Sequence, residues 1–451
     1  MPCTEEIITL NRTELQEKVE KIRNTSQLAE MIMAAWELGL WIAKKIVEQI
    51  LEERASRRVC WQNCPECGAK LDNKGRLDRE MKSIIGTISW RRKVGRCPNH
   101  CQIGQIAPLD DELGIKPDQR VSTEVQKMSC ALAVFVPYEI AAMLLSLLTK
   151  VCASPVSIWQ WVQKIGHLSI TKMEEELASG RLPDEEAMTD EMASLPLVLG
   201  GDGVLVPFRP YGGSPHGKTR YRQVLVGIVA RLKQMVNRRG RTIVKIVRKR
   251  LVAVLNNSDS FGKRLWLEAW RQRITYSYPV VWISDGGYTF WNIFRDHFAH
   301  WARGVLDFYH AVQNVWKAAS AWLDGRTKMA HQWLATIRHL LRYGQPCDVL
   351  RKVHRPLIDE PLSDSARKAL ENLLSYLQNH YQHIHYSDLK ARNLPIGSGM
   401  VESACKWLIQ QRFKGVGMRW SVNGFNHLLQ LRLAWVNERF DEVFSNTPRT
   451  R

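Results

Sequence analysis

The pattern of apolar and polar residues changes several times along the N-terminal part of the chain. Residues 13–56 carry apolar side chains at helical spacing with charged residues between them, which predicts one or two amphipathic helices. A short stretch rich in Cys, Gly and Pro follows, and its β-type runs, such as "SIIGTISWRRKV", indicate a small separate module. Helical patterns return from about residue 117 to 170.

The last of these helical patterns, "SPVSIWQWVQKIGHL", has a start signal at Pro155 and a stop signal at Gly166. Two shorter helices precede it, so a helix-turn-helix unit is one interpretation, with three polar residues facing DNA: Ser157, Gln160 and Lys164. A plain helical bundle with Trp159 and Trp161 in its core is the alternative. The acidic segment "PDEEAMTDEMASLP" that follows is interpreted as a linker.

Residues 195–315 have a mixed α/β pattern, with three β-rich runs joined by tight connections and two more that alternate with helical segments. This order predicts a mixed sheet with an antiparallel start and a parallel remainder. From 311 to about 390 almost every segment has helical spacing. The chain is therefore divided into an N-terminal helical region, a Cys-rich module, a helix-turn-helix-like region, the first part of an α/β core, a helical insertion and the C-terminal helices of the core: 1–58, 59–110, 111–180, 195–315, 316–392 and 393–445.

Composition adds a preferred class of partner. The 451 residues include 64 Lys and Arg against 45 Asp and Glu, a formal net charge of +19, which favours a polyanion such as nucleic acid over an ordinary basic protein. No apolar stretch approaches the roughly 20 residues that span a bilayer, and the first residues are too acidic and polar for a signal peptide. We therefore expect a cytoplasmic protein associated with the nucleoid and no membrane partner, in which the ten cysteines are thiols or metal ligands.

Four cysteines form two knuckles of the kind that hold a structural Zn²⁺. Two residues separate Cys64 from Cys67, and a 29-residue gap leads to Cys97 and Cys101, which three residues separate, one more than in the first knuckle. Four thiolates satisfy tetrahedral zinc and leave no open position for water, so a structural zinc ribbon is predicted. His100 and Cys60 compete as ligands, and a hairpin with reduced thiols is the alternative.

Acidic residues occur where the pattern asks for apolar ones. Asp202 interrupts the apolar strand "LVLGGDGVLVPF", where a carboxylate is costly unless it is paired or binds a cation. Asp285 ends the apolar run "VVWISDGG", which in an open α/β sheet is the strand edge where sites form. Asp307 ends a third short run, "GVLDFYH", and His310 begins the next helix. A turn or a helix cap is the ordinary alternative for each of them.

Glu402 in "GSGMVESACKWLIQQRFKGVGMRW" has two competing interpretations. With Gly399 as N-cap it would be the third helical residue, the usual place for a capping glutamate. At 100° per residue it also falls within about 20° of Ile409, at the margin of an apolar face. The members of that face are Val401, Cys405, Leu408 and Ile409. Glu402 is therefore predicted to point along the packing surface towards the sheet.

Carboxylates on two strands and one late helix could together hold two divalent cations about 3.5 to 4 Å apart. Such a pair activates a water or a 3′-hydroxyl and stabilises the leaving oxygen of a phosphodiester. The oxygen-only ligand set suits Mg²⁺ or Mn²⁺ rather than zinc.

These motifs resemble those of a known family. "GDG" on a first strand, "SDGG" ending a fourth, "DFYH" beyond it and the glutamate segment together look like the RNase H-like DDE transposases of bacterial insertion sequences, Mutator-related and closest to the ISKra type. The resemblance covers roughly residues 195–440. It implies Asp202, Asp285 and Glu402 as first, second and third catalytic acids and metal ligands. It also implies a helical insertion before the glutamate helix. Asp307 stands where the Mutator-type C(2)H pattern has Cys, which leaves Asp307 and His310 as accessory ligands or structural residues.

On this resemblance the partner is double-stranded DNA, both the terminal inverted repeats of the element and the target, bound by a homo-oligomer. The basic run "NRRGRTIVKIVRKR" and the cations after Glu402 would contact phosphates. The predicted DNA-binding residues are Arg238, Arg239, Arg241, Arg248, Lys249, Arg250, Lys406, Arg412, Lys414 and Arg419. A solvated edge strand and a helix-dipole preference are the ordinary alternatives for these cations.

Three functions therefore follow from the sequence. The first is a transposase that cleaves DNA strands and transfers them at element ends. The second is an RNase H-like structure-selective nuclease or resolvase, which would share the metal chemistry. The third is a non-catalytic DNA-binding regulator descended from a transposase.

Overall fold

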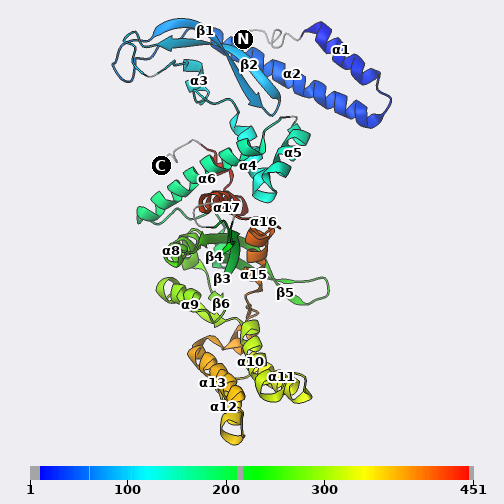
Figure 1. The fold of residues 1–451 in the computed structure, drawn as a ribbon, viewed down its shortest axis with the longest axis vertical. Coiled ribbons are helices and arrows are strands. Elements are labelled where there is room, and N and C mark those ends of the chain that lie inside the picture. The colour runs from blue at the N-terminus through cyan, green and yellow to red at the C-terminus, as the bar shows by residue number, and fades with distance from the viewer. Residues whose placement is uncertain (1–10, 60, 103, 150, 211–216, 446–451) are drawn as a thin grey trace. The chain divides into compact units, whose positions relative to one another are not determined.

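The computed structural model describes residues 11–59, 61–102, 104–149, 151–210 and 217–445 (Figure 1). The chain forms two compact units, residues 1–162 and 163–451. The six finer regions predicted from the sequence stay a prediction. Among the described residues, no helix combines the length and the apolar character needed to cross a membrane.

The first unit begins with the two predicted amphipathic helices, α1 (Arg12–Arg23) and α2 (Leu28–Ser56). The Cys-rich module is an antiparallel hairpin of β1 (Asp72–Ser83) and β2 (Gly86–Arg96), followed by the short α3 (Pro108–Glu112). Apolar residues of α2, both strands and α3 form one small core, so the hairpin is anchored on the long helix. Its buried members are Leu51, Ala55, Met81, Ile88, Trp90 and Leu109.

Helices α4 (Thr123–Phe135) and α5 (Tyr138–Thr149) follow, and then α6 (Pro155–Ala178). The predicted end of the last helix near Gly166 is wrong, because the helix continues for another three turns. Gly166 serves a close contact instead: a Cβ there would overlap the backbone of His427. Trp159 is 45% exposed, which contradicts the alternative that placed both tryptophans in a core.

The second unit is built on a five-stranded sheet whose order is β5-β4-β3-β6-β7. The strands are β3 (Leu197–Phe208), β4 (Arg220–Val236), β5 (Thr242–Leu255), β6 (Val280–Ser284) and β7 (Arg303–Leu306). The first three pair antiparallel, whereas β3 with β6 and β6 with β7 are parallel. The mixed sheet predicted from the order of β-rich runs is confirmed.

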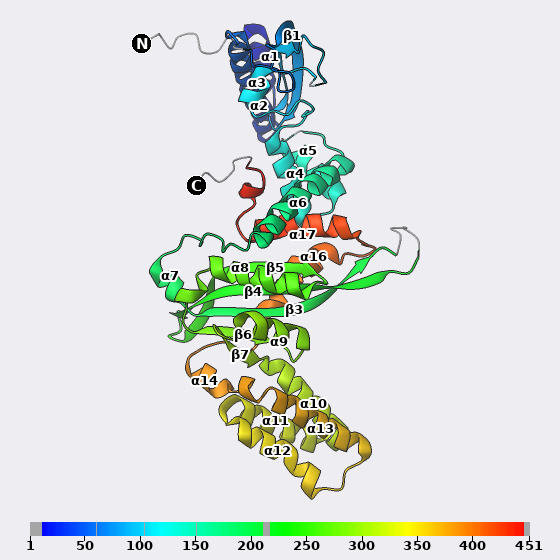
Figure 2. The ribbon, with the colours of Figure 1, turned by 90° about the vertical axis from the view of Figure 1, so that its left-hand side faces the viewer.

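Helices cover both faces of this sheet (Figure 2). One face packs on α8 (Ser258–Arg271), α9 (Tyr288–Ile293) and the π-helical η3 (Phe294–Phe298), and Leu197 and Leu199 belong to this core. Val198, between them, belongs to the core of the opposite face, because neighbouring residues of a strand point to opposite sides. The short α7 (Asp190–Ser194) and η2 (Ile274–Tyr276) lie at the ends of connections.

The chain from 308 to 391 is helical, as its pattern predicted. Its elements are α10 (Phe308–Leu323), α11 (Lys328–Tyr343), α12 (Pro346–Asp359), α13 (Asp364–Asn379), η4 (Tyr381–His383) and α14 (Tyr386–Ala391). Their apolar faces form one core that continues onto β6 and β7, so the helical block is packed directly against the sheet. Ala311, Ile337 and Leu370, from three different helices, are completely buried in it.

After this block the chain returns to the sheet. The elements are α15 (Gly399–Ala404), the π-helical η5 (Cys405–Gln410), α16 (Gln411–Phe413), α17 (Val422–Val436) and η6 (Asp441–Val443). The predicted apolar face of the glutamate segment is confirmed, because its four members are at most 2% exposed. A Cβ at Gly200 of β3 would touch Val401 Cγ2, so α15 lies closely over β3.

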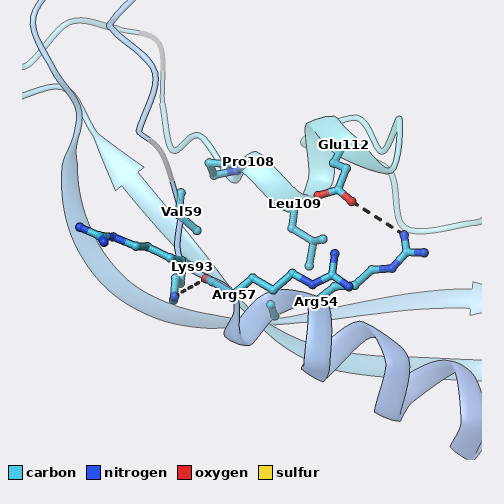
Figure 3. A pocket seen from close by; sticks show the side chains of 9 residues that line it. Arg54, Arg57, Val59, Lys93, Pro108, Leu109 and Glu112 are labelled. Atoms are coloured by element: carbon cyan, nitrogen blue, oxygen red, sulfur yellow. Dashed lines mark hydrogen bonds and ion pairs between the residues drawn. The ribbon is translucent and has the colours of Figure 1, made fainter. Parts of the chain in front are cut away.

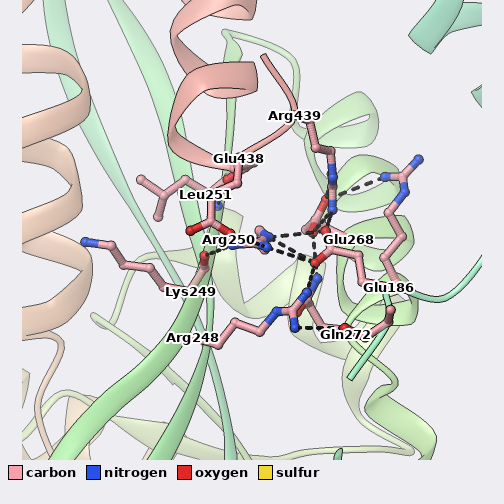
Figure 4. A network of polar contacts seen from close by, with 12 residues as sticks. Glu186, Arg248, Lys249, Arg250, Leu251, Glu268, Gln272, Glu438 and Arg439 are labelled. Carbon is pink, nitrogen blue, oxygen red and sulfur yellow. Dashed lines mark hydrogen bonds and ion pairs between the residues drawn. The ribbon is translucent and has the colours of Figure 1, made fainter. Parts of the chain in front are cut away.

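The acidic segment predicted as a linker is docked on the second unit through Glu186 (Figure 4). Its carboxylate forms ion pairs with Arg248, Arg250 and Arg439, and Arg439 also pairs with Glu268 at 2.7 Å. Burial by itself raises the pKa of Glu186, but the hydrogen bond from Arg250 and the charge of Arg439 outweigh it and the pKa is lowered. The segment therefore joins β5, α8 and the chain after α17.

Candidate functional site

Asp202 and Asp285 lie at matching positions of two neighbouring parallel strands. Gly200 of β3 pairs with Ile283 of β6, and each acid is two residues further along. Asp202 shares the face of Val198 and Gly200, which is the face that α15 covers. The pairing of these strands thus brings the first two predicted acids next to each other, where β6 ends.

Asp202 is half-buried among like charges. Its Oδ1 accepts a hydrogen bond from the N–H of Gly203 at 2.6 Å, and the thiol of Cys405 lies 3.9 Å from its Oδ2. The pKa of Asp202 is raised by burial and by the charges of Asp285 and Glu402, against the opposing effect of the Gly203 N–H. The charge of His310 acts in the opposite direction, but the pKa of Asp202 is still raised overall.

The loop after β6 fixes Asp285 through its backbone as well as its side chain. Its Oδ1 accepts from the N–H of Gly287 at 3.0 Å. Its carbonyl oxygen accepts from Trp291 Nε1 at 2.6 Å and from Ser284 Oγ at 3.0 Å. These three hydrogen bonds hold Asp285 at the end of β6.

Glu402 occupies the first helical turn, one position later than predicted. Ser398, not Gly399, is the N-cap residue, so Glu402 is the fourth residue of the helix. Its N–H donates to Ser398 O at 3.1 Å. The helix then widens into the π-helical η5, a form that occurs often at functional sites. The backbone N–H of Glu402 thus takes part in the first helical turn, but among the described residues no side-chain hydrogen bond caps the start of this helix.

Glu402 meets Asp307 and His310. One potential ligand atom from each of the three lies within 4.8 Å of the other two. Asp307, the N-cap of α10, is completely buried. His310 Nδ1 lies 3.3 Å from Asp307 Oδ1. The sequence left the role of Asp307 open, and the structure shows it at the junction of β7, α10 and the glutamate helix.

Both carboxylate oxygens of Asp307 accept hydrogen bonds. The His310 N–H donates to Oδ1 at 2.8 Å and the Ser398 N–H donates to Oδ2. Burial raises the pKa of Asp307, but the hydrogen bonds from His310 and Ser398 prevail and lower it to about 2. The pKa of His310 is raised, first by its hydrogen bond to Asp307 and further by the charges of Asp285 and Glu402. Asp307 is therefore favoured as a carboxylate and His310 as a cation, and the charge of His310 also acts on Asp285 and Glu402.

The four cysteines predicted as zinc ligands are brought together in the first unit, with all four sulfur atoms within 4.8 Å of one another. Cys67 Sγ lies 3.4 Å from Cys97 Sγ. Hydrogen bonding, first to the backbone at Ala69 and then to Cys97, lowers the pKa of Cys67 to about 6. The pKa of Cys97 is raised mainly by burial, and that of Cys101 mainly by its hydrogen bond to Cys67. Cys101 rather than His100 belongs to this cluster. Cys60 lies outside the described residues.

The predicted DNA-binding cations divide into two groups. One group is exposed: Arg238, Arg239, Arg241, Lys249, Lys406, Lys414 and Arg419. The other group is engaged inside the protein: Arg248 and Arg250 pair with Glu186, and Arg412 is 2% exposed. The structure therefore places three of the ten where phosphate contact would require displacing an internal partner or exposing a buried side chain.

A cavity of about 190 Å³ in the first unit opens between α2, β2 and α3, and several basic residues line it (Figure 3). Arg57 and Arg58 at its rim are exposed. Lys93 donates to the carbonyl of Arg57 at 2.7 Å and so caps the end of α2. Sequence reasoning did not single out these residues, although "ERASRR" is a visible basic cluster.

Comparison with known proteins leaves the family open. No family model matches the chain, and no curated protein matches it. Among solved structures, the Drosophila P element transposase strand transfer complex is similar over 71% of this chain and 93% of that chain. The sequence identity is 11% and the TM-score is 0.36, a likeness too weak to establish a shared fold.

Proposed function

We propose that this protein is a DNA transposase of the DDE type, which cleaves phosphodiesters and transfers strands with the help of divalent metal ions. The observation that carries the proposal is the concentration of acids around Asp202, which come from distant parts of the chain. Asp202 on β3 is next to Asp285 at the end of β6, and both Asp285 and Glu402 raise the pKa of Asp202.

The donor set fits Mg²⁺ or Mn²⁺. The charges of Asp285 and Glu402 raise the pKa of Asp202, and a cation bound between the carboxylates would offset this repulsion. Carboxylate oxygens are the ligands that these ions prefer. Asp202, Asp285 and Glu402 would hold the metal. When bound, a pair of such ions supplies an activated water or 3′-hydroxyl and a stabilised leaving oxygen.

Asp307 and His310 have a positioning role in this proposal. Both oxygens of Asp307 are used by hydrogen bonds, one of them to the N-cap of the helix that carries Glu402. A carboxylate so engaged is better suited to fixing Glu402 than to binding a metal ion. His310 would balance part of the negative charge of the acids, since Asp285 and Glu402 both act on its pKa.

The proposal includes an RNase H-like identity for the core. Three antiparallel strands followed by two parallel ones support it, with the first acid on the central strand β3. The helical block between β7 and α15 fits an insertion ahead of the third acid. The three helices α4 to α6 fit a helix-turn-helix unit for terminal-repeat recognition, and the four-cysteine cluster fits a structural zinc ribbon.

The exposed cations supply the DNA contacts of the proposal. Arg238, Arg239 and Arg241 surround the turn between β4 and β5, and Lys414 and Arg419 follow the glutamate helix. Their partners would be the phosphates of element ends and target DNA, with the protein assembled as a homo-oligomer on DNA in the nucleoid. Such contacts give affinity that falls steeply with salt.

The test is strand cleavage and joining by the purified full-length chain. The substrate is labelled duplex carrying the sequences that flank the coding region, with Mg²⁺ or Mn²⁺. Nicking at a defined boundary and joining to a second duplex are expected, and Asp202→Asn, Asp285→Asn and Glu402→Gln should each abolish both. Cleavage that follows branch structure regardless of terminal sequence would replace the transposase by a nuclease. Equal activity of Asp202→Asn and wild type would overturn the site.

A further inference from the structure

The helical block contacts the Asp285 loop directly. Gly286, the residue after Asp285, lies against the ring of Tyr376 on α13, and a Cβ at position 286 would overlap that ring. The sequence explains Gly286 only as part of a strand-end turn. The structure gives a second reason, because any side chain there would push either the loop or α13 away.

Three more side chains extend this contact into an aromatic cluster, defined as Trp291, Tyr376, His380 and His383. The Trp291 ring stacks on His383 with centroids 4.2 Å apart and lies 5.0 Å from the His380 ring. The rings of Tyr376 and His380 are 5.3 Å apart. The cluster joins the end of α13 and the following η4 to α9, the helix that begins directly after the Asp285 loop.

The aromatic cluster forms hydrogen bonds with the backbone of the Asp285 loop and with that of the neighbouring strand β7. Trp291 Nε1 donates to the carbonyl oxygen of Asp285 at 2.6 Å. His383 Nδ1 lies 3.2 Å from the carbonyl oxygen of Gly304 on the neighbouring strand β7. One set of rings therefore connects the strand edge at Asp285 with the strand that leads to Asp307.

Electrostatics agrees with this proximity. The pKa of Tyr376 is raised to about 12 by burial, and the charges of Asp285 and Asp307 act in the same direction. The pKa of His380 is lowered to about 4 by burial and by His383, although the charge of Asp285 opposes this. The rings of the aromatic cluster are thus neutral at pH 7, so none of them forms an ion pair with Asp285.

We propose that Tyr376 and His380 are positioning residues that hold the Asp285 loop in the geometry needed for metal binding, so that the helical block sets part of the metal site. This inference rests on the proposed function. The role belongs to the ring of Tyr376 packed on Gly286 and to the ring of His380 against Trp291. Neither side chain is a metal ligand or touches the reacting atoms.

The test is an isothermal calorimetric titration of the full-length chain with Mn²⁺ alone, which measures the affinity for the ion. Tyr376→Leu removes the ring and is expected to weaken Mn²⁺ binding about tenfold, the lower end of the range for residues that orient metal ligands. Tyr376→Phe keeps the ring and should restore wild-type affinity. Gln378→Ala, at an exposed position of the same helix, is the matched control and should leave affinity unchanged.

A second pair of variants guards against a general loss of fold. Gly286→Ala should weaken Mn²⁺ binding when Tyr376 is present, and adding Tyr376→Ala should cause little further loss, because the overlap is then relieved. Asp285→Asn, titrated in the same way, tests the metal site itself. If Asp285→Asn binds Mn²⁺ like wild type, the proposed function fails. If Asp285→Asn loses binding while Tyr376→Leu keeps it, or if Gly286→Ala and Tyr376→Ala are simply additive, the positioning role fails.

Discussion

Asp307 accepts a hydrogen bond from the backbone N–H of Ser398, the residue that caps the helix carrying Glu402. The two residues are 91 positions apart, so this contact joins the end of β7 to the start of α15 across the whole helical block. Asp307→Asn places an amide where two N–H donors require acceptors, and it should lower the free energy of unfolding by about 2 kcal/mol, the usual value for hydrogen bonds to charged groups.

The rate of strand cleavage by Asp307→Asn should fall even under conditions in which the variant is fully folded. The reason is that the helix carrying Glu402 would lose its hydrogen bond to Asp307. Denaturant unfolding and cleavage rate, measured on the same preparation, separate the two effects. Asp324→Asn, which changes an exposed carboxylate at the other end of α10, is the control. Full activity in a destabilised Asp307→Asn would show that Asp307 serves folding alone.

The three acids are expected to oppose folding when no divalent cation is present. Asp202 is pushed towards its protonated form by burial and by Asp285 and Glu402, so neutralising it relieves repulsion. Asp202→Asn should therefore raise the melting temperature of the metal-free protein while lowering strand cleavage by at least about a thousandfold, as for a member of a catalytic unit. Thermal unfolding with and without Mn²⁺ checks this. A lower metal-free melting temperature for the variant would contradict the electrostatic account.

The Glu186 ion pairs predict a pH-dependent stability. Because the folded-state pKa of Glu186 is lowered, its contribution is fully present above the unfolded value near 4.5 and is lost as the pH falls through the folded pKa. Glu186→Gln should cost about 2 kcal/mol at pH 7. The difference in the free energy of unfolding between Glu186→Gln and wild type should become smaller below about pH 4.5. Urea unfolding at several pH values measures it, with Asp184→Asn, in an exposed position of the same segment, as the control. If this difference in the free energy of unfolding does not change with pH, the ion pairs of Glu186 are not its cause.

The cysteine cluster predicts one zinc per chain. Metal analysis of the purified protein should give this stoichiometry, and Cys64→Ser or Cys97→Ser should lose the zinc and expose the hairpin to proteolysis, because structural zinc contributes folding energy directly. Cys347→Ser, at an exposed thiol outside the cluster, should retain it. Retention of stoichiometric zinc by both cluster variants would refute the assignment.

The division of the basic residues into exposed and engaged groups predicts different salt dependences. Replacing Arg238, Arg239 and Arg241 by Ala should reduce the slope of log K against log salt by up to about 3, since each phosphate contact contributes about 0.9. Fluorescence anisotropy with duplex DNA from 50 to 200 mM salt measures the slope, a range over which phosphate contacts are strongly weakened. Arg351→Ala and Arg355→Ala, exposed on α12, are the controls. An unchanged slope in the triple variant would remove the β4–β5 turn from the interface.

Local pattern predicted the parts of the molecule in which neighbours in sequence are neighbours in space. The alternation of β-rich and helical runs was sufficient for the mixed sheet, and helical spacing was sufficient for the apolar face of Val401, Cys405, Leu408 and Ile409. The cost of a carboxylate in an apolar strand was sufficient to single out Asp202. These inferences use only burial and periodicity, which a few residues encode.

The remaining features depend on partners that are distant in sequence. Arg248 and Arg250 look like phosphate ligands until Glu186, more than 60 residues upstream, is placed against them. Gly166 looks like a helix stop until His427 is placed beside it. The contact of Tyr376 with Gly286 could not be anticipated either, because no local rule relates a tyrosine on an amphipathic helix to a strand-end glycine.

The late arrival of α15 has a consequence for biosynthesis. Glu402 follows Asp202 by 200 residues, and at typical elongation rates of 5 to 20 residues per second this is a delay of about 10 to 40 s. During that time a nascent chain can form β3 to β7 while the strand surface opposite Val401 stays uncovered. On the proposed function, a ribosome-bound fragment that ends before α15 would lack the third acid and would be unable to cut DNA. The order of synthesis thus leaves the proposed metal site incomplete until α15 has been made.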